Sequence, residues 1–203
     1  QMDFPKESIL GILKNPVFSS LFIIILVSSF GLQAFESIYS IMATINFGFT
    51  TNDIALVITI SGSLALICQV FLFDWIVSKL GEMRLIQLTF FVSATFIAVI
   101  AFTTSHLVVV LSTFVVFLSF DLFRPAVTTY LSKNGGNQQG AINGLNSTFT
   151  SFGNILGPLA AGSLFDLNHF YPYYVSAMIL LGTGFLSLFL TNMTSKKLLL
   201  KKS

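Results

Sequence analysis

The sequence has 203 residues, of which 54% are hydrophobic and 9% are charged, and its mean hydropathy is +0.87. Because a soluble domain carries roughly 25% charged residues, this composition excludes a soluble globular protein and favours one that lies in a bilayer. The net charge of +2 says little by itself, and nucleic-acid binding is not expected. Cys68 is the single cysteine, so the chain builds neither an internal disulfide nor a thiolate metal site.

Six apolar runs long enough to cross a membrane predict six transmembrane helices. They cover residues 17–45, 54–77, 85–103, 107–132, 140–164 and 173–191. We therefore expect an all-α integral membrane protein in which residues 1–16 form a cytoplasmic linker segment, 17–193 a six-helix unit and 194–203 a basic cytoplasmic tail.

Basic residues alternate between the loops, and this alternation predicts the orientation. They precede the first run, follow the second, fourth and sixth runs, and are absent from the other loops: Lys6, Lys14, Lys79, Arg84, Lys133, Lys196, Lys197, Lys201 and Lys202. The positive-inside rule then places both chain ends in the cytoplasm. Residues 1–15 are polar, so no cleavable signal peptide is expected. Because Gln1 is not an initiator residue, we expect a piece of a longer protein, with a start at Met2 as the alternative.

Asp121 and Arg124 lie within the fourth run, where each ionised group costs about 2.5 to 3.5 kcal/mol at the bilayer centre. On a helix they share one face with Phe114, Phe117 and Thr128. One interpretation is that Arg124 neutralises Asp121 and the pair fixes helix packing. The other is that Asp121 is a titrating carboxylate that lines a pathway.

Glu36 belongs to a polar stripe on the first run. Ser29, Gln33, Glu36 and Ser40 fall within an arc of about 60° on a helix. Glu36 has no basic neighbour within a turn, so a buried Glu36 either finds a partner on another helix or takes up a proton. A glutamate that caps the helix or anchors it at the interface is the alternative.

The fifth run carries a longer polar stripe without charge. Its members lie within an arc of about 100°: Asn143, Asn146, Ser147, Thr150 and Asn154. Gly153 and Gly157 form a G-x-x-x-G pair that lets another backbone approach, and Pro158 is expected to bend the helix or loosen one turn. Packing alone explains the glycines, whereas the polar stripe favours a wet cavity.

Other charged or metal-ligating residues lie near the loops. Asp74, Lys79 and Arg84 surround the turn after the second run and predict a cytoplasmic charge clamp, with ordinary interfacial charge as the alternative. His106 and His169 have no acid or cysteine at a metal-ligand spacing, so no metal site is expected.

The six runs divide into two triplets, and the acids Glu36 and Asp121 each lie on the first helix of a triplet. Triplets of three helices have opposite orientations in the membrane, which is the inverted 3+3 repeat common in transporters. Simple helix arithmetic places Glu36 about 33 Å from Lys14 but Asp121 about 18 Å from Lys133 along their axes. Direct contact between the acids therefore requires tilt or uneven protrusion.

Several segments resemble a known family. The stretches Gly31–Glu36, Phe120–Ala126, Leu145–Ser151 and Gly157–Leu159 are similar to the C-terminal half of Gram-positive multidrug/proton antiporters, which are major facilitator efflux pumps of the NorA and Bmr type. The resemblance covers about residues 16–166. The glycine spacing around Pro158 also resembles the antiporter signature of that family, although Ala161 stands where that signature has a glycine.

The resemblance implies twelve spans in two halves of a bacterial cell-membrane pump. Such a pump exports cationic or amphipathic drugs, such as fluoroquinolones and dyes, in exchange for protons and without another cofactor. Its partner would be an N-terminal six-helix half. By this resemblance Glu36 and Asp121 would carry the protons, and Arg124 and Asn154 would lie in the substrate cavity. The polar and aromatic faces add further candidates for that cavity: Gln33, Phe114, Phe117, Asn143, Asn146 and Thr150. We also expect Phe22 to contribute to an aromatic cavity wall near Glu36.

Two other functions remain open. A major facilitator half that moves sugars or other neutral metabolites is one, although 23 phenylalanines favour amphipathic substrates. A non-transporting assembly subunit is the other. An enzyme is not expected, because the predicted spans contain no histidine and the sequence has no Gly-x-Ser-x-Gly motif.

Overall fold

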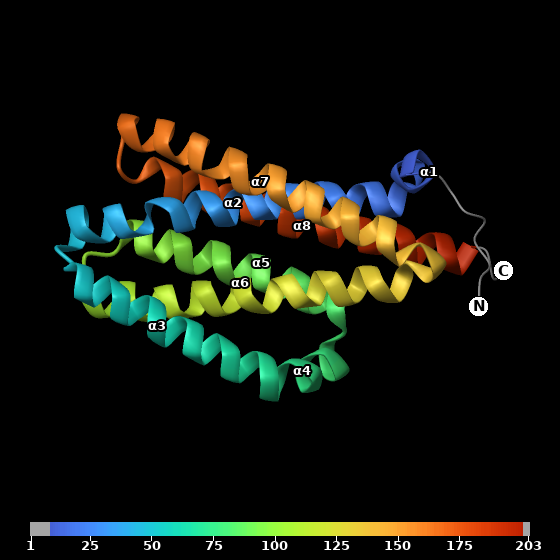
Figure 1. The fold of residues 1–203 in the computed structure, drawn as a ribbon, viewed down its shortest axis with the longest axis horizontal. Helices are drawn as coiled ribbons and strands as arrows, with labels where there is room; N and C mark the ends of the chain where they lie inside the picture. Colours follow the sequence, from blue (N-terminus) through green and yellow to red (C-terminus); the bar gives the residue numbers. More distant parts are fainter. Residues whose placement is uncertain (1–8, 201–203) are drawn as a thin grey trace.

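The computed structural model describes residues 9–200, and this part of the chain folds into a bundle of long helices (Figure 1). In chain order the elements are α1 (Ile9–Lys14), α2 (Pro16–Phe47), α3 (Thr51–Ile67), the π-helix η1 (Cys68–Leu72), α4 (Phe73–Leu80), α5 (Glu82–Phe102), α6 (His106–Asn134), the 3₁₀-helix η2 (Gly136–Gln138), α7 (Gln139–Leu167) and α8 (Tyr171–Leu200). The outermost parts of the expected linker and tail, residues 1–8 and 201–203, lie outside the described residues.

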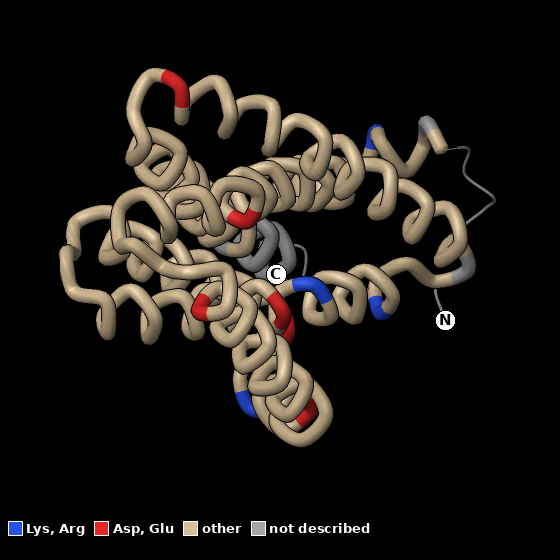
Figure 2. Tube along the Cα trace, turned by 60° about the vertical axis from the view of Figure 1, so that its left-hand side comes forward, with Lys and Arg blue, Asp and Glu red and all other residues tan. Residues whose placement is uncertain are grey.

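Each expected span coincides with one long helix or with the run from α3 to α4, apart from Thr103, which lies just beyond the end of α5, so the predicted all-α membrane fold is confirmed. Five of these runs are long and apolar enough to cross a membrane: α2, α3 to α4, α5, α6 and α8. The remaining run, α7, has 29 residues, and its polar stripe lowers its hydropathy. Helix α8 continues to Leu200, beyond the expected end of the sixth span. Figure 2 shows long stretches of helix without a charged residue.

Local residue choices define the first helix boundaries. The Asn15 side chain accepts a hydrogen bond from the backbone N–H of Val17 at 3.0 Å and caps α2. Gly48 ends α2 with φ of 65°, a left-handed conformation that glycine adopts without strain. Thr50 and Asp53 then form a reciprocal capping box that starts α3. These caps allow a short turn to reverse the chain between two long apolar helices.

The helices pack in a pattern that agrees with the expected inverted repeat. Helix α2 packs against α7 and α8, and α6 packs against α3 and α5. In the two triplets, α2 corresponds to α6, α3 to α7 and α5 to α8. Under this correspondence the contacts of α2 with α7 and α8 become the contacts of α6 with α3 and α5, and the contact between α5 and α8 maps onto itself. The bundle therefore has the contact pattern of two structurally related triplets.

The run from α3 to α4 lies at the edge of the bundle (Figure 1). Its apolar side chains are largely exposed, with Val70 65% and Phe71 75% accessible. The sequence did not predict the π-helix η1, which interrupts this run where no side chain is buried. Since apolar side chains avoid water, this surface suits lipid or another apolar protein surface.

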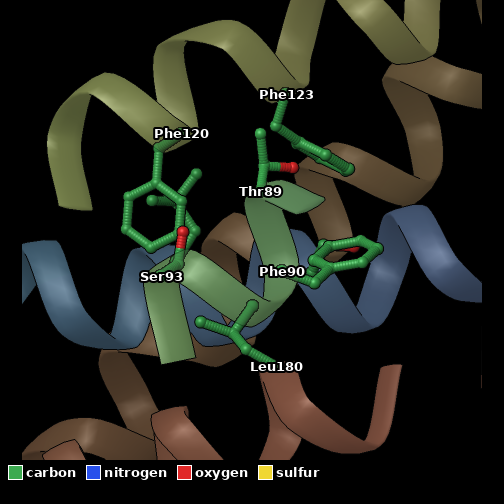
Figure 3. A pocket seen from close by; sticks show the side chains of 8 residues that line it. Thr89, Phe90, Ser93, Phe120, Phe123 and Leu180 are labelled. Atoms are coloured by element: carbon green, nitrogen blue, oxygen red, sulfur yellow. The ribbon is translucent and has the colours of Figure 1, made fainter. Parts of the chain in front are cut away.

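A small void lies where α2, α5, α6 and α8 meet (Figure 3). Its volume is about 10 Å³, and it is lined by Ser28, Leu32, Thr89, Phe90, Ser93, Phe120, Phe123 and Leu180. Figure 3 shows Thr89 and Ser93 of α5 opposite Phe120 and Phe123 of α6. This void has room for no more than about one water molecule, and the larger cavity described next shares Leu32 and Phe123 with it but extends to α7.

Candidate functional site

The larger cavity lies between α2, α6 and α7 and has a volume of about 360 Å³, within the range of small-molecule sites. Its apolar lining comes from α2 and α6 and consists of Ile25, Leu32, Phe123 and Val127. Its uncharged polar lining comes from all three helices and consists of Ser29, Thr128, Asn146, Ser147, Thr150, Ser151 and Asn154. Arg124 completes the lining as its one charged residue. The cavity therefore combines an apolar wall, a polar wall and a single cation.

A very close approach of α7 to α2 forms one side of this cavity. A Cβ atom added at Gly153 would lie 2.6 Å from the Ser29 Cβ atom and 2.7 Å from the Leu26 carbonyl oxygen. At Gly157 it would lie 2.7 Å from the Phe30 carbonyl oxygen. These contacts require glycine at both positions, because backbone atoms cannot move aside as a flexible side chain can. The expected helix-packing role of the two glycines agrees with this geometry.

Helix α7 continues through Pro158 to Leu167. Proline has no N–H group, so the Asn154 carbonyl loses its helical donor four residues later. Pro125 lies inside α6 in the same way and removes the helical donor for the Asp121 carbonyl. Each proline therefore leaves a backbone carbonyl with unused acceptor capacity at a candidate site residue.

Glu36 and Asp121 approach each other between α2 and α6. Glu36 lies within electrostatic range of both Asp121 and Arg124, and its carboxylate accepts a hydrogen bond from the Gln33 side chain. Both carboxylic acids are partly buried. No direct contact between the two acids is found among the described residues, but both lie within electrostatic range of Arg124, and the three residues form one electrostatic cluster.

Aromatic rings fill the space between these two helices. Phe117 lies next to Phe35 and Tyr39, with ring centroids 6.0 and 5.7 Å away, and Phe120 lies 6.2 Å from Phe35. Because these residues flank Glu36 and Asp121 in sequence, the rings help to set the spacing between the acid-bearing segments of α2 and α6.

Arg124 is exposed and forms no direct ion pair with Asp121 within the described part of the chain. The guanidinium nevertheless lies within electrostatic range of Asp121 as well as Glu36. A closed local pair, which was one interpretation of the sequence, is therefore not the arrangement found here. Arg124 instead lines the cavity while its charge acts on both acids.

The structure brings only some of the expected cavity residues to the cavity. Arg124, Asn146, Thr150 and Asn154 line it. The other expected residues lie elsewhere: Gln33 at Glu36, Phe114 and Phe117 against the core, and Asn143 on an exposed part of α7. Phe22 is fully buried and stacks on Phe149, so it does not form the expected wall. Aromatic character alone did not distinguish packing between helices from exposure to the cavity.

Sequence reasoning missed part of the cavity. Ser151, Phe123, Ile25, Leu32 and Val127 line it without having been singled out. Ser151 lies four residues, or about one helical turn, after Ser147. It could therefore have been predicted as a further member of the polar stripe. The four apolar residues carried no such signal, because apolar positions on a membrane helix look alike whether they face lipid, core or cavity.

At the end of the bundle where α4 meets α5, an ion pair is present, but it is formed by other residues than those of the expected clamp. Asp74, Lys79 and Arg84 are exposed, and none of them forms an ion pair with any residue whose side chain the structure describes. The ion pair in this range joins Lys133, near the end of α6, to Glu82 at the start of α5. The difference arises because α6 packs along α5, whereas α4 lies at the edge of the bundle.

We expect the Glu82 to Lys133 pair to contribute modestly to stability. Lys133 is 64% exposed, and water screens such a pair, so Glu82→Gln should lower the free energy of unfolding by less than about 1 kcal/mol. Asp74→Asn should have no measurable effect. Thermal unfolding of the purified full-length protein tests both variants. A larger loss of stability in Asp74→Asn than in Glu82→Gln would instead support the charge clamp that the sequence predicted.

At the opposite end of the bundle, His106 ties the start of α6 to the α2–α3 turn. Its Nε2 atom lies 2.5 Å from the Phe47 carbonyl oxygen, and its ring stacks on Phe49 at 5.7 Å. This structural contact was not foreseen from the sequence. Within residues 9–200 no group of three or more His, Cys, Asp or Glu side chains is arranged to hold a metal ion.

A bundle of membrane-length helices with paired triplets, intramembrane acids and a polar cavity has the architecture of one half of a membrane transporter. Residues 10–202 match the family model described as Major Facilitator Superfamily. The chain belongs to this family.

Two groups of relatives have names that refer to drug resistance. Multidrug resistance protein 2 of Bacillus subtilis is 47% identical over 167 residues, which is 82% of this chain and 42% of that protein. Quinolone resistance protein NorA of Staphylococcus aureus is 39% identical over 160 residues, which is 79% of this chain and 41% of that protein. The chain therefore spans about two fifths of the length of these relatives.

Proposed function

We propose that this chain is the C-terminal half of a proton-coupled multidrug exporter. The observation that carries the proposal is the cluster of Glu36, Asp121 and Arg124 beside a cavity with one apolar and one polar wall. Acids within a membrane are costly and mark proton or substrate pathways by default. The names of the relatives, which refer to multidrug and quinolone resistance, support a drug as the transported molecule.

In this mechanism Glu36 and Asp121 take up protons from outside and release them inward as the drug enters from the cytoplasm. Protonation neutralises both acids, so the apolar rings that pack between α2 and α6, such as Phe35 and Phe117, can close around uncharged groups. Loss of the protons restores negative charge that attracts a cationic group of the drug. Proton binding and drug binding thus compete for the same charges, as exchange requires.

The proposal includes a partner and a location. An N-terminal six-helix half would complete the cavity that α2, α6 and α7 line in this chain. We place the assembled pump in the bacterial cell membrane with both ends of this half in the cytoplasm, as the alternation of basic loops indicates. Protons are the coupling ion, and neither a cofactor nor an enzymatic step is part of the proposal.

A transporter of sugars or other neutral metabolites is the second candidate. The seven uncharged polar residues of the cavity favour it, because sugar sites are rich in hydrogen-bonding groups. The apolar wall and the acid pair favour the drug exporter. Cells that produce the full-length transporter distinguish the two: we expect energy-dependent efflux of ethidium and no stimulated uptake of labelled sugars. Sugar uptake without dye efflux would favour the second candidate.

A further inference from the structure

The charge of the cavity lining differs from what a binding site for cations alone would need. Arg124 is its one charged residue, and neither Glu36 nor Asp121 lines it. The remaining polar lining consists of hydroxyl and carboxamide groups, which carry no charge. A cationic group placed here would face the guanidinium and be repelled, whereas an anionic group would be attracted.

Arg124 is also available to bind a ligand. Its side chain is exposed, and among residues 9–200 it forms no direct ion pair with an acid. A guanidinium presents a planar fork of N–H donors that matches the two oxygens of a carboxylate. Asn146 and Asn154 on the facing helix α7 supply further N–H donors.

The surroundings of Arg124 therefore favour groups of both charges. Glu36 and Asp121 lie within its electrostatic range, do not line the cavity and suit a cationic group. The cavity itself has a positive lining and an apolar wall that includes Leu32 and Phe123. A flat amphipathic molecule with an amine at one end and a carboxylate at the other would match both the acids and the cavity.

We propose that the cavity beside Arg124 is a subsite for the carboxylate of zwitterionic amphipathic substrates. Arg124 binds the carboxylate, the asparagines of α7 donate additional hydrogen bonds to it, and the apolar wall contacts the flat body of the molecule. The inference rests on the proposed export function and deepens it by distinguishing two classes of drug. Cationic compounds without an acid group do not use this subsite.

The test compares three ligands on the purified full-length transporter. Ciprofloxacin carries an amine and a carboxylate, its methyl ester lacks the carboxylate, and ethidium is a cation without an acid group. Equilibrium binding is measured by fluorescence at one fixed pH for the wild type, Arg124→Gln and Arg124→Lys. Lys133→Gln is the matched control, since it removes one positive charge from the same helix outside the cavity.

We expect Arg124→Gln to weaken ciprofloxacin binding by about tenfold or more, as the loss of a charge-assisted hydrogen bond predicts. Binding of the ester and of ethidium should change by less than about threefold. Arg124→Lys should recover part of the loss, because it restores charge without the fork, and Lys133→Gln should resemble the wild type.

Equal weakening of acid and ester in Arg124→Gln would overturn the inference, since Arg124 would then act on the cavity as a whole. Unchanged ciprofloxacin binding in that variant would also overturn it. A wild-type protein that binds none of the three ligands would contradict the proposed drug export itself, and the wild-type measurements alone distinguish that failure from the failure of the subsite.

Discussion

Glu36→Gln and Asp121→Asn should each abolish drug efflux by the full-length transporter while the protein remains in the membrane. An amide has nearly the shape of the carboxylic acid and still forms hydrogen bonds, but it cannot take up and release a proton at the pH of the cell. Because the change also removes a costly intramembrane charge, the variants should fold at least as well as the wild type. Ethidium efflux from energised cells and the amount of protein in the membrane are the two measurements.

Asp166→Asn provides the matched control for these acids. Asp166 lies near the end of α7, is exposed and does not line the cavity. Its replacement should leave efflux unchanged. If both Glu36→Gln and Asp121→Asn retained wild-type efflux and proton movement, the coupling role of the acids would be refuted. If the variants disappeared from the membrane, the acids would be structural instead.

Gly153→Ala should produce the second large effect, a loss of stability accompanied by a loss of transport. The new Cβ atom would lie 2.6 Å from the Ser29 Cβ atom and 2.7 Å from the Leu26 carbonyl oxygen, about an ångström inside a normal contact. Relief requires α2 and α7 to separate, at a cost of about 1 to 3 kcal/mol. This separation would also displace Ser29 and Asn154 on the cavity wall. Thermal unfolding and drug efflux of the full-length protein report the two effects.

Gly162→Ala is the control on the same helix. No atom lies within 4 Å of a Cβ atom added there, so this variant should match the wild type in efflux and be at least as stable, because alanine favours a helix more than glycine does. Similar losses in both variants would mean that glycine flexibility in α7 matters more than the close approach to α2. No loss in Gly153→Ala would contradict the packing described for the two helices.

The fold was largely predictable from the sequence because a bilayer imposes strong constraints. Apolar length gave six spans, and each lies in a long helix or helical run. The pair Gly153 and Gly157 predicted a close helix approach, and the structure identifies α2 as the partner helix. Sequence spacing fixes which residues share a face, but it does not reveal which other helix lies against that face.

Residues of the candidate site could be predicted only where a polar or charged side chain lies within an otherwise apolar stretch of sequence. Glu36, Asp121 and Arg124 stood out for this reason, and the structure places them in one cluster. The positions of Phe22 in the core and of Phe117 against it were not predictable, because a phenylalanine on a membrane helix suits core, cavity and lipid alike. The Glu82 to Lys133 pair joins residues 51 positions apart, and local charge patterns do not predict such a tertiary contact.

Proton movement during drug transport tests the central claim most directly. The full-length transporter is reconstituted in weakly buffered proteoliposomes with a pH indicator inside, and drug is added to one side. The account predicts that drug moving one way drives protons the other way, and that an imposed pH gradient drives drug against its own gradient. Drug transport at an undiminished rate with no accompanying proton movement, and with no response to the pH gradient, would contradict it.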